Sequence, residues 1–244
     1  MTRNLFGIGK KKVVKVSPKH CRVITDLLGP DGDAMDSWRV FRIMAEFVSG
    51  FDLLRKHGLA ATFFGSARTK VGDPYYTAAE ELAAKLAKKK FSIVTGGGPG
   101  IMEASNVGAF KVGGKSIGLN IELGTEQKLN EYVNDNSSFE FFFSRKVMLA
   151  YASEVYVYFP GGFGTLDEFF EIVTLVQTKK IEKIPIVLYG KDYWEPLVKW
   201  IEKDLLKKHK TISKEDLDLF VLVDSVDEAY KYILKHVDTS IGDC

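Results

Sequence analysis

From residue 59 onward, short apolar runs alternate with stretches whose apolar residues recur at helical spacing. The apolar runs are 59–64, 91–95, 116–121, 139–143, 154–159, 184–189 and 220–223. The stretches that follow them are long enough for helices: about 74–90, 101–110, 144–152, 165–178, 193–206 and 226–237. Apolar strands separated by helices are typical of a parallel sheet covered on both faces. With right-handed crossovers, the pattern predicts an α/β fold with a Rossmann-like, doubly wound parallel sheet.

The first 58 residues do not share this alternation. Up to about residue 36 they contain turn signals without sustained periodicity. Over 38–57, apolar residues recur every three or four positions, which predicts an amphipathic helix that ends before Gly58. We therefore expect an N-terminal extension with one helix (1–58) and an α/β domain (59–244). Whether the helix packs on that domain or on a second subunit stays open.

Composition argues against several classes of partner. The 244 residues carry 34 Lys and Arg against 32 Asp and Glu, so a nucleic acid or a membrane surface is not the expected partner. No apolar stretch approaches the roughly 20 residues needed to span a bilayer. Cys21 and Cys244 lack the spacing of a metal or redox motif. Scarce, unpaired cysteines fit a reducing compartment, and we expect a cytoplasmic protein.

Two glycine-rich segments follow predicted strands and lead into predicted helices. They read T-G-G-G-P-G-I-M-E over 95–103 and P-G-G-F-G-T-L-D-E over 160–168. In doubly wound sheets, ligands bind beyond the C-terminal ends of the strands. The free N–H groups and partial positive charge of a helix start suit phosphate. One such segment is as easily a tight turn, but two at one edge favour a nucleotide or sugar-phosphate site.

Other nucleotide and hydrolase motifs are missing from these segments. Neither matches G-x-x-x-x-G-K-[ST], which disfavours ATP hydrolysis. The dinucleotide pattern G-x-G-x-x-G fails because Ile101 stands where its third glycine belongs, which disfavours a dehydrogenase. There is no G-x-S-x-G elbow, so a hydrolase of the catalytic-triad type has no support.

Two interpretations of Glu168 stay open. Thr165 followed three residues later by Glu168 is a capping-box arrangement, in which the carboxylate only satisfies a backbone N–H group. In the other interpretation the loop amides face a phosphate while the carboxylate faces the sugar and acts in catalysis. We favour the second, although one residue can serve both.

A basic pair, Arg145-Lys146, falls at the start of a predicted helix, where cations oppose the helix dipole. A ligand or an acidic partner explains such a placement better than local stability, although a surface salt bridge is as common for a lysine. Arg145 is the stronger candidate, because a guanidinium offers fixed donors to phosphate or carboxylate. Ser66 and Arg68, after the first strand, are a third possible contact, although a serine there more often caps the turn.

Three segments together resemble one known family. P-G-G-F-G-T-L-D-E over 160–168, S-R-K-V-M over 144–148 and G-G-G-P-G-I-M-E-A over 96–104 resemble the LONELY GUY family of cytokinin riboside 5′-monophosphate phosphoribohydrolases, often labelled "lysine decarboxylase". The resemblance covers about 59–237. Residues 65–68 and 117–122 look like its longer-chain branch, which has an N-terminal helical extension.

The resemblance implies hydrolysis of the N-glycosidic bond of a nucleoside 5′-monophosphate, with release of free base and ribose 5-phosphate. In the longer-chain branch, AMP or another purine monophosphate is as good a candidate as a cytokinin. The resemblance also implies a homodimer or larger homo-oligomer with the site near the subunit interface. We expect neither a metal nor a cofactor, because no motif for pyridoxal phosphate accompanies the decarboxylase label. The alternative is a non-catalytic nucleotide-binding or carrier protein of the same fold.

The resemblance assigns roles residue by residue. Arg145 and Glu168 would be the catalytic pair. In the second glycine segment, the residues expected to hold the phosphate are Gly161, Gly162, Gly164 and Thr165. Outside that segment, the resemblance implies further substrate contacts at Lys146, Glu126 and Thr174. The first glycine segment and the turn after the first strand add Gly97, Gly98, Glu103, Ser66 and Arg68.

Overall fold

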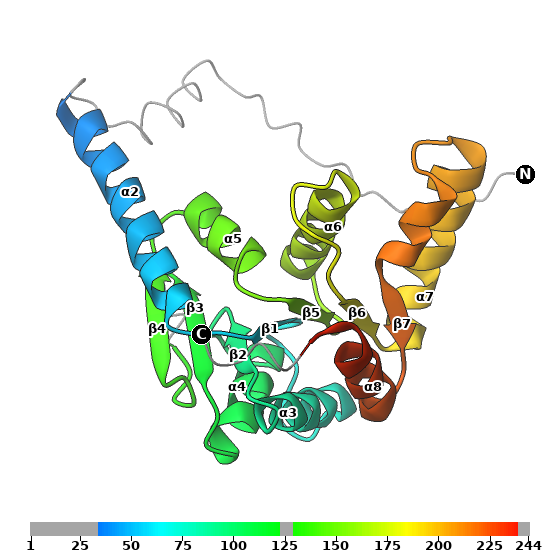
Figure 1. Cartoon of the computed structure of the whole chain (residues 1–244), viewed down its shortest axis with the longest axis horizontal. Coiled ribbons are helices and arrows are strands. Elements are labelled where there is room, and N and C mark those ends of the chain that lie inside the picture. Colours follow the sequence, from blue (N-terminus) through cyan, green and yellow to red (C-terminus); the bar gives the residue numbers. More distant parts are fainter. Residues whose placement is uncertain (1–33, 123–128, 239–244) are drawn as a thin grey trace, which may run out of the picture. The chain divides into compact units, whose positions relative to one another are not determined.

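The computed structural model describes residues 34–122 and 129–238 (Figure 1). The chain divides into two compact units, Met1–Met44 and Ala45–Cys244. Helix α2 (Ala34–Arg55) spans the division between them. We keep the predicted domain boundary after residue 58 as a proposal. Within the described ranges, no helix is long and apolar enough to cross a membrane.

The second unit is built on one sheet of seven parallel strands in the order β4-β3-β2-β1-β5-β6-β7. The strands are β1 (Ala60–Phe64), β2 (Ser92–Thr95), β3 (Ser116–Ile121), β4 (Asp135–Phe139), β5 (Val155–Tyr158), β6 (Ile186–Tyr189) and β7 (Val221–Val223). The chain runs outward from β1 to β4 and then returns to place β5 on the other side of β1. The strand order therefore reverses between β1 and β5, and a doubly wound sheet binds ligands at such a point. The predicted Rossmann-like fold is confirmed.

Helices cover both faces of this sheet. They are α3 (Pro74–Ala87), α4 (Ile101–Lys111), α5 (Phe142–Ala150), α6 (Phe163–Gln177), α7 (Lys191–Trp200), its π-helical continuation η2 (Ile201–Lys208), the 3-10 helix η3 (Lys214–Leu219) and α8 (Val226–His236). Figure 1 shows α3, α4 and α8 on one face and α5, α6 and α7 on the other. The free N-terminus of α6 follows β5 directly, so it lies at the reversal point.

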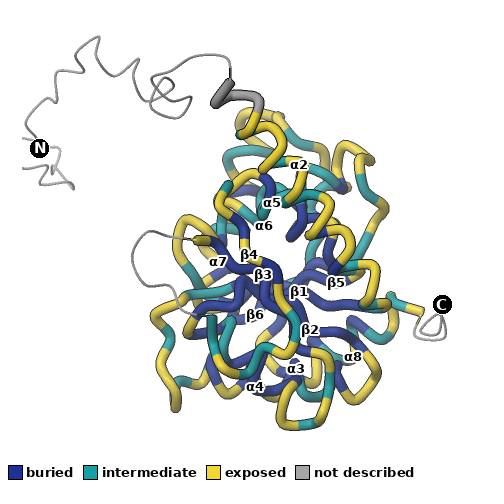
Figure 2. Tube along the Cα trace, turned by 90° about the vertical axis from the view of Figure 1, so that its left-hand side faces the viewer, coloured by how far each residue is buried: buried dark blue, intermediate teal, exposed yellow. Residues whose placement is uncertain are grey.

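Alternation along each strand divides the buried side chains between two cores, and the sheet is the most buried part of the trace in Figure 2. Phe63 and Val157 pack with α3, α4 and α8, while their neighbours Phe64 and Tyr158 pack with α5, α6 and α7. Each fully buried side chain of this size contributes about 1.5–3 kcal/mol of transfer free energy. Two such layers hold the strand ends, and the loops that leave them, in fixed positions.

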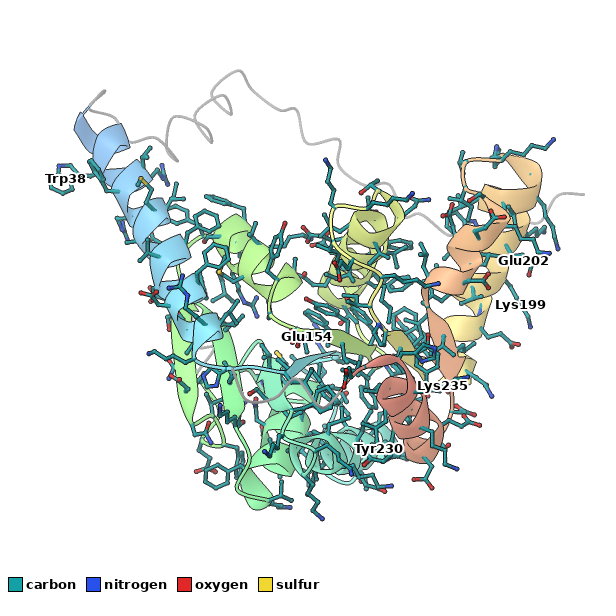
Figure 3. All side chains as sticks on the ribbon, in the orientation of Figure 1. Trp38, Glu154, Lys199, Glu202, Tyr230 and Lys235 are labelled. Carbon is teal, nitrogen blue, oxygen red and sulfur yellow. The ribbon has the colours of Figure 1, made fainter. Side chains whose placement is uncertain are left out.

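Local signals in the sequence place most elements within two or three residues. Asp73 caps α3: its Oδ1 accepts a hydrogen bond from the Tyr75 N–H at 2.8 Å, with Pro74 at the first helical position. Glu154, labelled in Figure 3, lies at the edge of the sheet where β1 and β5 begin. Its Oε2 accepts a 2.8 Å hydrogen bond from the Ala60 N–H.

The predicted strand over 139–143 is wrong. The strand is β4, which lies earlier in a polar stretch, and α5 already begins at Phe142. Only Ser137 and Phe139 of β4 are buried, because β4 is an edge strand with one side toward solvent. Phe142 and Phe143 completed an apolar run in the sequence, but their side chains are 63% and 51% exposed.

Candidate active site

Three loops meet where the strand order reverses: 65–68 after β1, 96–100 after β2, and 160–162 after β5. The Ser66 N–H donates to the Pro160 carbonyl at 2.9 Å, and the Ile101 N–H donates to the Ser66 carbonyl at 3.1 Å. Gly100 has a φ of +71°, and a Cβ there would lie 2.3 Å from the Ser66 oxygen. Only glycine therefore lets the first glycine segment approach the β1 turn this closely.

The second glycine segment ends in a helix start with no side-chain cap. Helix α6 begins at Phe163 with Gly162 as its N-cap, and the Leu166 N–H donates to the Gly162 carbonyl at 3.1 Å. Thr165 is thus the third residue of the helix, so the capping-box interpretation of Thr165 and Glu168, the less favoured of the two, does not hold. The Thr165 side chain instead folds over Gly161, where a Cβ would lie 2.1 Å from its hydroxyl oxygen. The helix starts earlier because Gly161 leaves room for that side chain.

The first N–H groups of α6 are suited to an anion. A helix leaves its first N–H groups without intrahelical partners, and no side chain caps this one. A Cβ added at Gly162 or Gly164 would meet no atom within 4 Å, so packing inside the chain does not require glycine there. Open space beside free backbone donors fits the predicted phosphate site.

We expect the glycines of this loop to separate stability from binding. Gly161→Ala would force Thr165 aside and should lower the melting temperature by several degrees. Gly164→Ala adds a methyl group to open space in a helix, so stability should stay equal or rise by about 0.5–1 kcal/mol. The same methyl group should weaken binding of ribose 5-phosphate about tenfold or more. Thermal unfolding and calorimetric titration check both; unchanged phosphate binding in Gly164→Ala would place the ligand elsewhere.

Arg145 reaches the same place from α5. Its Nε donates to the Leu119 carbonyl at the end of β3 at 2.7 Å. A Cβ at Gly96 would lie 2.2 Å from its Nη2, so the guanidinium lies against the first glycine segment. Burial lowers the pKa of Arg145, and the negative charge of Glu168 partly opposes this. Gly96 is thus a site residue that the sequence prediction missed, and it is needed because the arginine takes its side-chain space.

Glu168 lies in the second turn of α6. Its Oε2 is buried, and no atom of the described residues forms a hydrogen bond with it. Burial, with help from Glu171 and Asp167 and against Lys146 and Arg145, raises the pKa of Glu168 to about 7. Such a carboxyl group exchanges a proton at neutral pH, which is suited to acid–base chemistry. A strongly shifted group at a ligand-binding edge marks a functional candidate.

Lys146 joins α5 to α6. Its ammonium forms ion pairs with Asp167 and, at 2.9 Å, with Glu171. Burial lowers the pKa of Lys146, but hydrogen bonds with these two carboxylates outweigh it and raise the pKa overall. The salt-bridge interpretation therefore describes this side chain in the structure. A direct contact between Lys146 and substrate stays a prediction.

The remaining residues predicted to contact substrate have other partners in the structure or lie away from the start of α6. The Ser66 hydroxyl accepts from the Arg68 N–H at 3.1 Å, so it shapes its turn, and Arg68 is exposed. Glu103 accepts from the Tyr76 hydroxyl at 3.3 Å. Thr174 is exposed and donates to the Phe170 carbonyl at 2.6 Å, roughly 13 Å along α6 from Thr165 at 1.5 Å per residue. Glu126 lies outside the described residues. The binding roles of these residues stay predictions.

The chain is similar in sequence to a known protein family. The sequence profile of a family described as "Possible lysine decarboxylase" matches residues 102–233, more than half of the chain. The chain belongs to this family. The resemblance to the LONELY GUY family is thereby confirmed, and named relatives agree with it.

Relatives in plants and bacteria carry one activity in their names. The chain is 33% identical over 132 residues to the probable cytokinin riboside 5′-monophosphate phosphoribohydrolase LOG6 of Arabidopsis thaliana, covering 53% of this chain and 65% of that protein. It is 27% identical over 146 residues to the cytokinin riboside 5′-monophosphate phosphoribohydrolase of Rhodococcoides fascians, covering 59% and 74%. The chain thus spans just under two thirds of the Arabidopsis relative.

Solved structures share the fold. The molybdenum cofactor carrier protein of Chlamydomonas reinhardtii matches with a TM-score of 0.56 and 21% identity, over 73% of this chain and 97% of that chain. The molybdenum cofactor binding protein of Rippkaea orientalis matches with a TM-score of 0.52 and 17% identity, over 72% and 94%. At such identities the likeness shows the fold alone.

Asn130, which no motif in the sequence marked, holds the first glycine segment of this chain. The Asn130 Nδ2 donates to the carbonyls of Gly97 and Gly98 at 3.1 and 3.0 Å and to Asn106 Oδ1 at 2.9 Å. Thr95 Oγ1 accepts from the Gly97 N–H at 2.9 Å and donates to Asn106 Oδ1 at 2.7 Å. This buried network fixes the first glycine segment. Asn130 lies more than thirty residues from the glycines that it holds, so no local motif marks it.

Removing the Asn130 side chain should make the first glycine segment more mobile. Asn130→Ala leaves the Gly98 carbonyl without its donor and removes one of the two bonds to the Gly97 carbonyl, which keeps the backbone N–H of residue 130 at 2.8 Å. We expect a loss of about 1–3 kcal/mol in the free energy of unfolding. The base release predicted from the family resemblance should fall about tenfold, because the Arg145 guanidinium lies against that segment. Asn134→Ala is the matched control, since Asn134 bonds Gly114 and Ser116 at the other end of β3. Denaturant unfolding and rate assays check this, and equal rate losses in both variants would exclude a specific role for Asn130.

Within the part of the chain that the structure describes, no group of three or more His, Cys, Asp or Glu side chains is placed to hold a metal ion.

Proposed function

We propose that the chain hydrolyses the N-glycosidic bond of a nucleoside 5′-monophosphate to free base and ribose 5-phosphate. The observation that carries the proposal is the buried, unpaired Oε2 of Glu168, in a carboxyl group with a pKa of about 7, within the electrostatic influence of Arg145. Two relatives whose names give this activity support it.

The site divides the nucleotide between two sets of groups. The open helix start of α6 supplies backbone N–H donors and a partial positive charge for the 5′-phosphate. Glu168 lies one turn further along the same helix and therefore faces the ribose rather than the phosphate. This arrangement removes the conflict between an anion-binding loop and a nearby carboxylate.

The chemistry follows from that arrangement. Breaking the bond between C1′ and the base nitrogen develops positive charge on the ribose ring, as in other glycoside hydrolyses. Ionised Glu168 stabilises this charge and accepts a proton from the water whose oxygen bonds to C1′. The base leaves with the electron pair of the broken bond and takes up one proton, and the proton accepted by Glu168 balances it when the carboxyl group ionises again. The Arg145 guanidinium, held by Leu119, orients Glu168 or the departing base through fixed donors.

The preferred base is a finer question. We propose AMP or a cytokinin riboside 5′-monophosphate as substrate, with purine monophosphates in general as the class. Assembly into a homodimer or larger homo-oligomer remains a prediction.

A panel of substrates tests the proposal. We expect free base from AMP and from isopentenyladenosine monophosphate, measured by chromatography, and much less from adenosine, which lacks the phosphate. No base from any nucleoside monophosphate would exclude the hydrolase. Tight nucleotide binding without turnover would instead support the non-catalytic binding or carrier alternative.

A further inference from the structure

The orientation of the peptide plane between Gly161 and Gly162 is not fixed by side chains of its own residues. With no Cβ on either side, such a peptide turns over at little steric cost. One orientation adds the Gly162 N–H to the donors of the helix start, whereas the reverse orientation presents the Gly161 carbonyl oxygen to an anion. Binding of a phosphate therefore requires something that fixes the orientation.

Tyr193 is in position to do this. Its hydroxyl donates to the Gly161 carbonyl at 2.5 Å. The peptide is trans, as are all peptide bonds in the described residues, so its C=O and N–H groups point in opposite directions. Because the Gly161 carbonyl is bonded to Tyr193, the Gly162 N–H is directed away from Tyr193, and Gly162 is the N-cap residue directly before the uncapped N–H groups of α6.

The start of α7 is itself held firmly. The Gly190 N–H donates to the Val223 carbonyl at 2.9 Å, and the Lys191 N–H donates to Asp224 Oδ1 at 3.0 Å. The Tyr193 ring packs edge-on against Trp194, which is fully buried. The far end of the helix is solvated, where Lys199 pairs with Glu195 at 3.0 Å and projects outward (Figure 3). Tyr193 itself is 36% exposed, but the ring contact with Trp194 and the bonded start of α7 hold its hydroxyl in place as a donor.

The geometry points to Tyr193 as a positioning residue that locks the Gly161–Gly162 peptide for recognition of a phosphate monoester. This inference rests on the proposed function for the identity of the whole substrate, but the phosphate-binding step stands on the loop alone. Helix α7, which lies outside the glycine segments, would thereby help the site to bind a nucleotide in preference to a nucleoside.

Tyr193→Phe tests the lock, because it removes only the hydroxyl. We expect the Kd for ribose 5-phosphate, measured by calorimetry on the full chain, to rise about tenfold, in line with one lost hydrogen bond. With AMP, KM should rise by a similar factor while kcat stays within about threefold, since Glu168 and Arg145 are untouched. Thermal unfolding should show that the fold is retained.

Tyr75→Phe is the matched control. The Tyr75 hydroxyl donates to Asp192 in the first turn of α7, so this variant also loses one tyrosine hydrogen bond at the same helix start. It makes no contact with the Gly161 carbonyl, and we expect its Kd for ribose 5-phosphate to change less than threefold.

The outcomes are separable. Unchanged affinity in Tyr193→Phe, an equal loss in Tyr75→Phe, or no binding of ribose 5-phosphate by the unmodified chain would each overturn the inference. If the unmodified chain binds ribose 5-phosphate but releases no base from AMP, the hydrolase proposal fails. In that case the comparison of Kd values still decides the role of Tyr193.

Discussion

Glu168→Gln is expected to lower the rate of base release by a factor on the order of 10³ while leaving the fold at least as stable. The amide keeps the size and the position of the side chain but can neither stabilise the developing charge as an anion nor accept a proton. The rate of the unmodified chain should rise with pH through about 7, because the ionised form of Glu168 is the active one.

The stability change has a defined sign. The pKa of Glu168 is raised in the folded chain from an ordinary 4.5 to about 7, mainly by burial. Its neutral form is thus favoured on folding, and the stability that this group contributes is full below pH 4.5 and is lost as pH rises through 7. Glu168→Gln should therefore be more stable than the unmodified chain at pH 8, by up to about 3 kcal/mol at 1.36 kcal/mol per pKa unit. At pH 5 the two should differ little.

Denaturant unfolding at both pH values, together with rate assays, checks this pair of effects. Glu182→Gln is a suitable control, because Glu182 is exposed. Retained activity with a lower melting temperature at pH 8 would mean that Glu168 acts in helix stability rather than in catalysis.

Arg145→Lys should lower the rate by a factor on the order of 10², although the positive charge is kept. Lysine has no Nε to donate to the Leu119 carbonyl and no planar fork to hold a carboxylate or a base. Lys146→Arg is the comparison, because an arginine there can keep the ion pairs with Asp167 and Glu171, and a loss of less than about tenfold is expected.

Removing the positive charge of Arg145 should also change the pH dependence of the rate. Arg145 lowers the pKa of Glu168, so in Arg145→Met the midpoint of the pH–rate profile should move above that of the unmodified chain. Steady-state rates between pH 5 and 9 measure both effects. If Arg145→Lys kept a third or more of the rate, the guanidinium would have no specific part in the reaction.

The buried parts of the fold could be predicted from the sequence because parallel strands covered on both faces are apolar throughout. Phe63 and Phe64 face opposite cores, yet both belong to the same apolar run. Strand β4 does not show this pattern, because an edge strand needs only one buried face, and Ser137 and Phe139 supply it within a polar stretch.

The site could be predicted only as far as its local signals reached. The glycine segments and the pair Arg145 and Glu168 lie in short motifs at strand ends. The capping-box alternative for Glu168 is excluded because Gly162 is the N-cap and Thr165 packs over Gly161, a contact that spacing alone does not reveal. Asn130 and Tyr193 act on the two glycine segments from elsewhere in the chain, through hydrogen bonds to backbone carbonyls that leave no pattern in one sequence.

Hydrolysis of AMP in water enriched in oxygen-18, followed by mass spectrometry of the products, tests directly whether this site cleaves an N-glycosidic bond. We predict one heavy oxygen on C1 of ribose 5-phosphate and none in the adenine. Heavy oxygen in released phosphate, or intact AMP after prolonged incubation, would contradict the assignment of Glu168 and Arg145 to N-glycosidic hydrolysis.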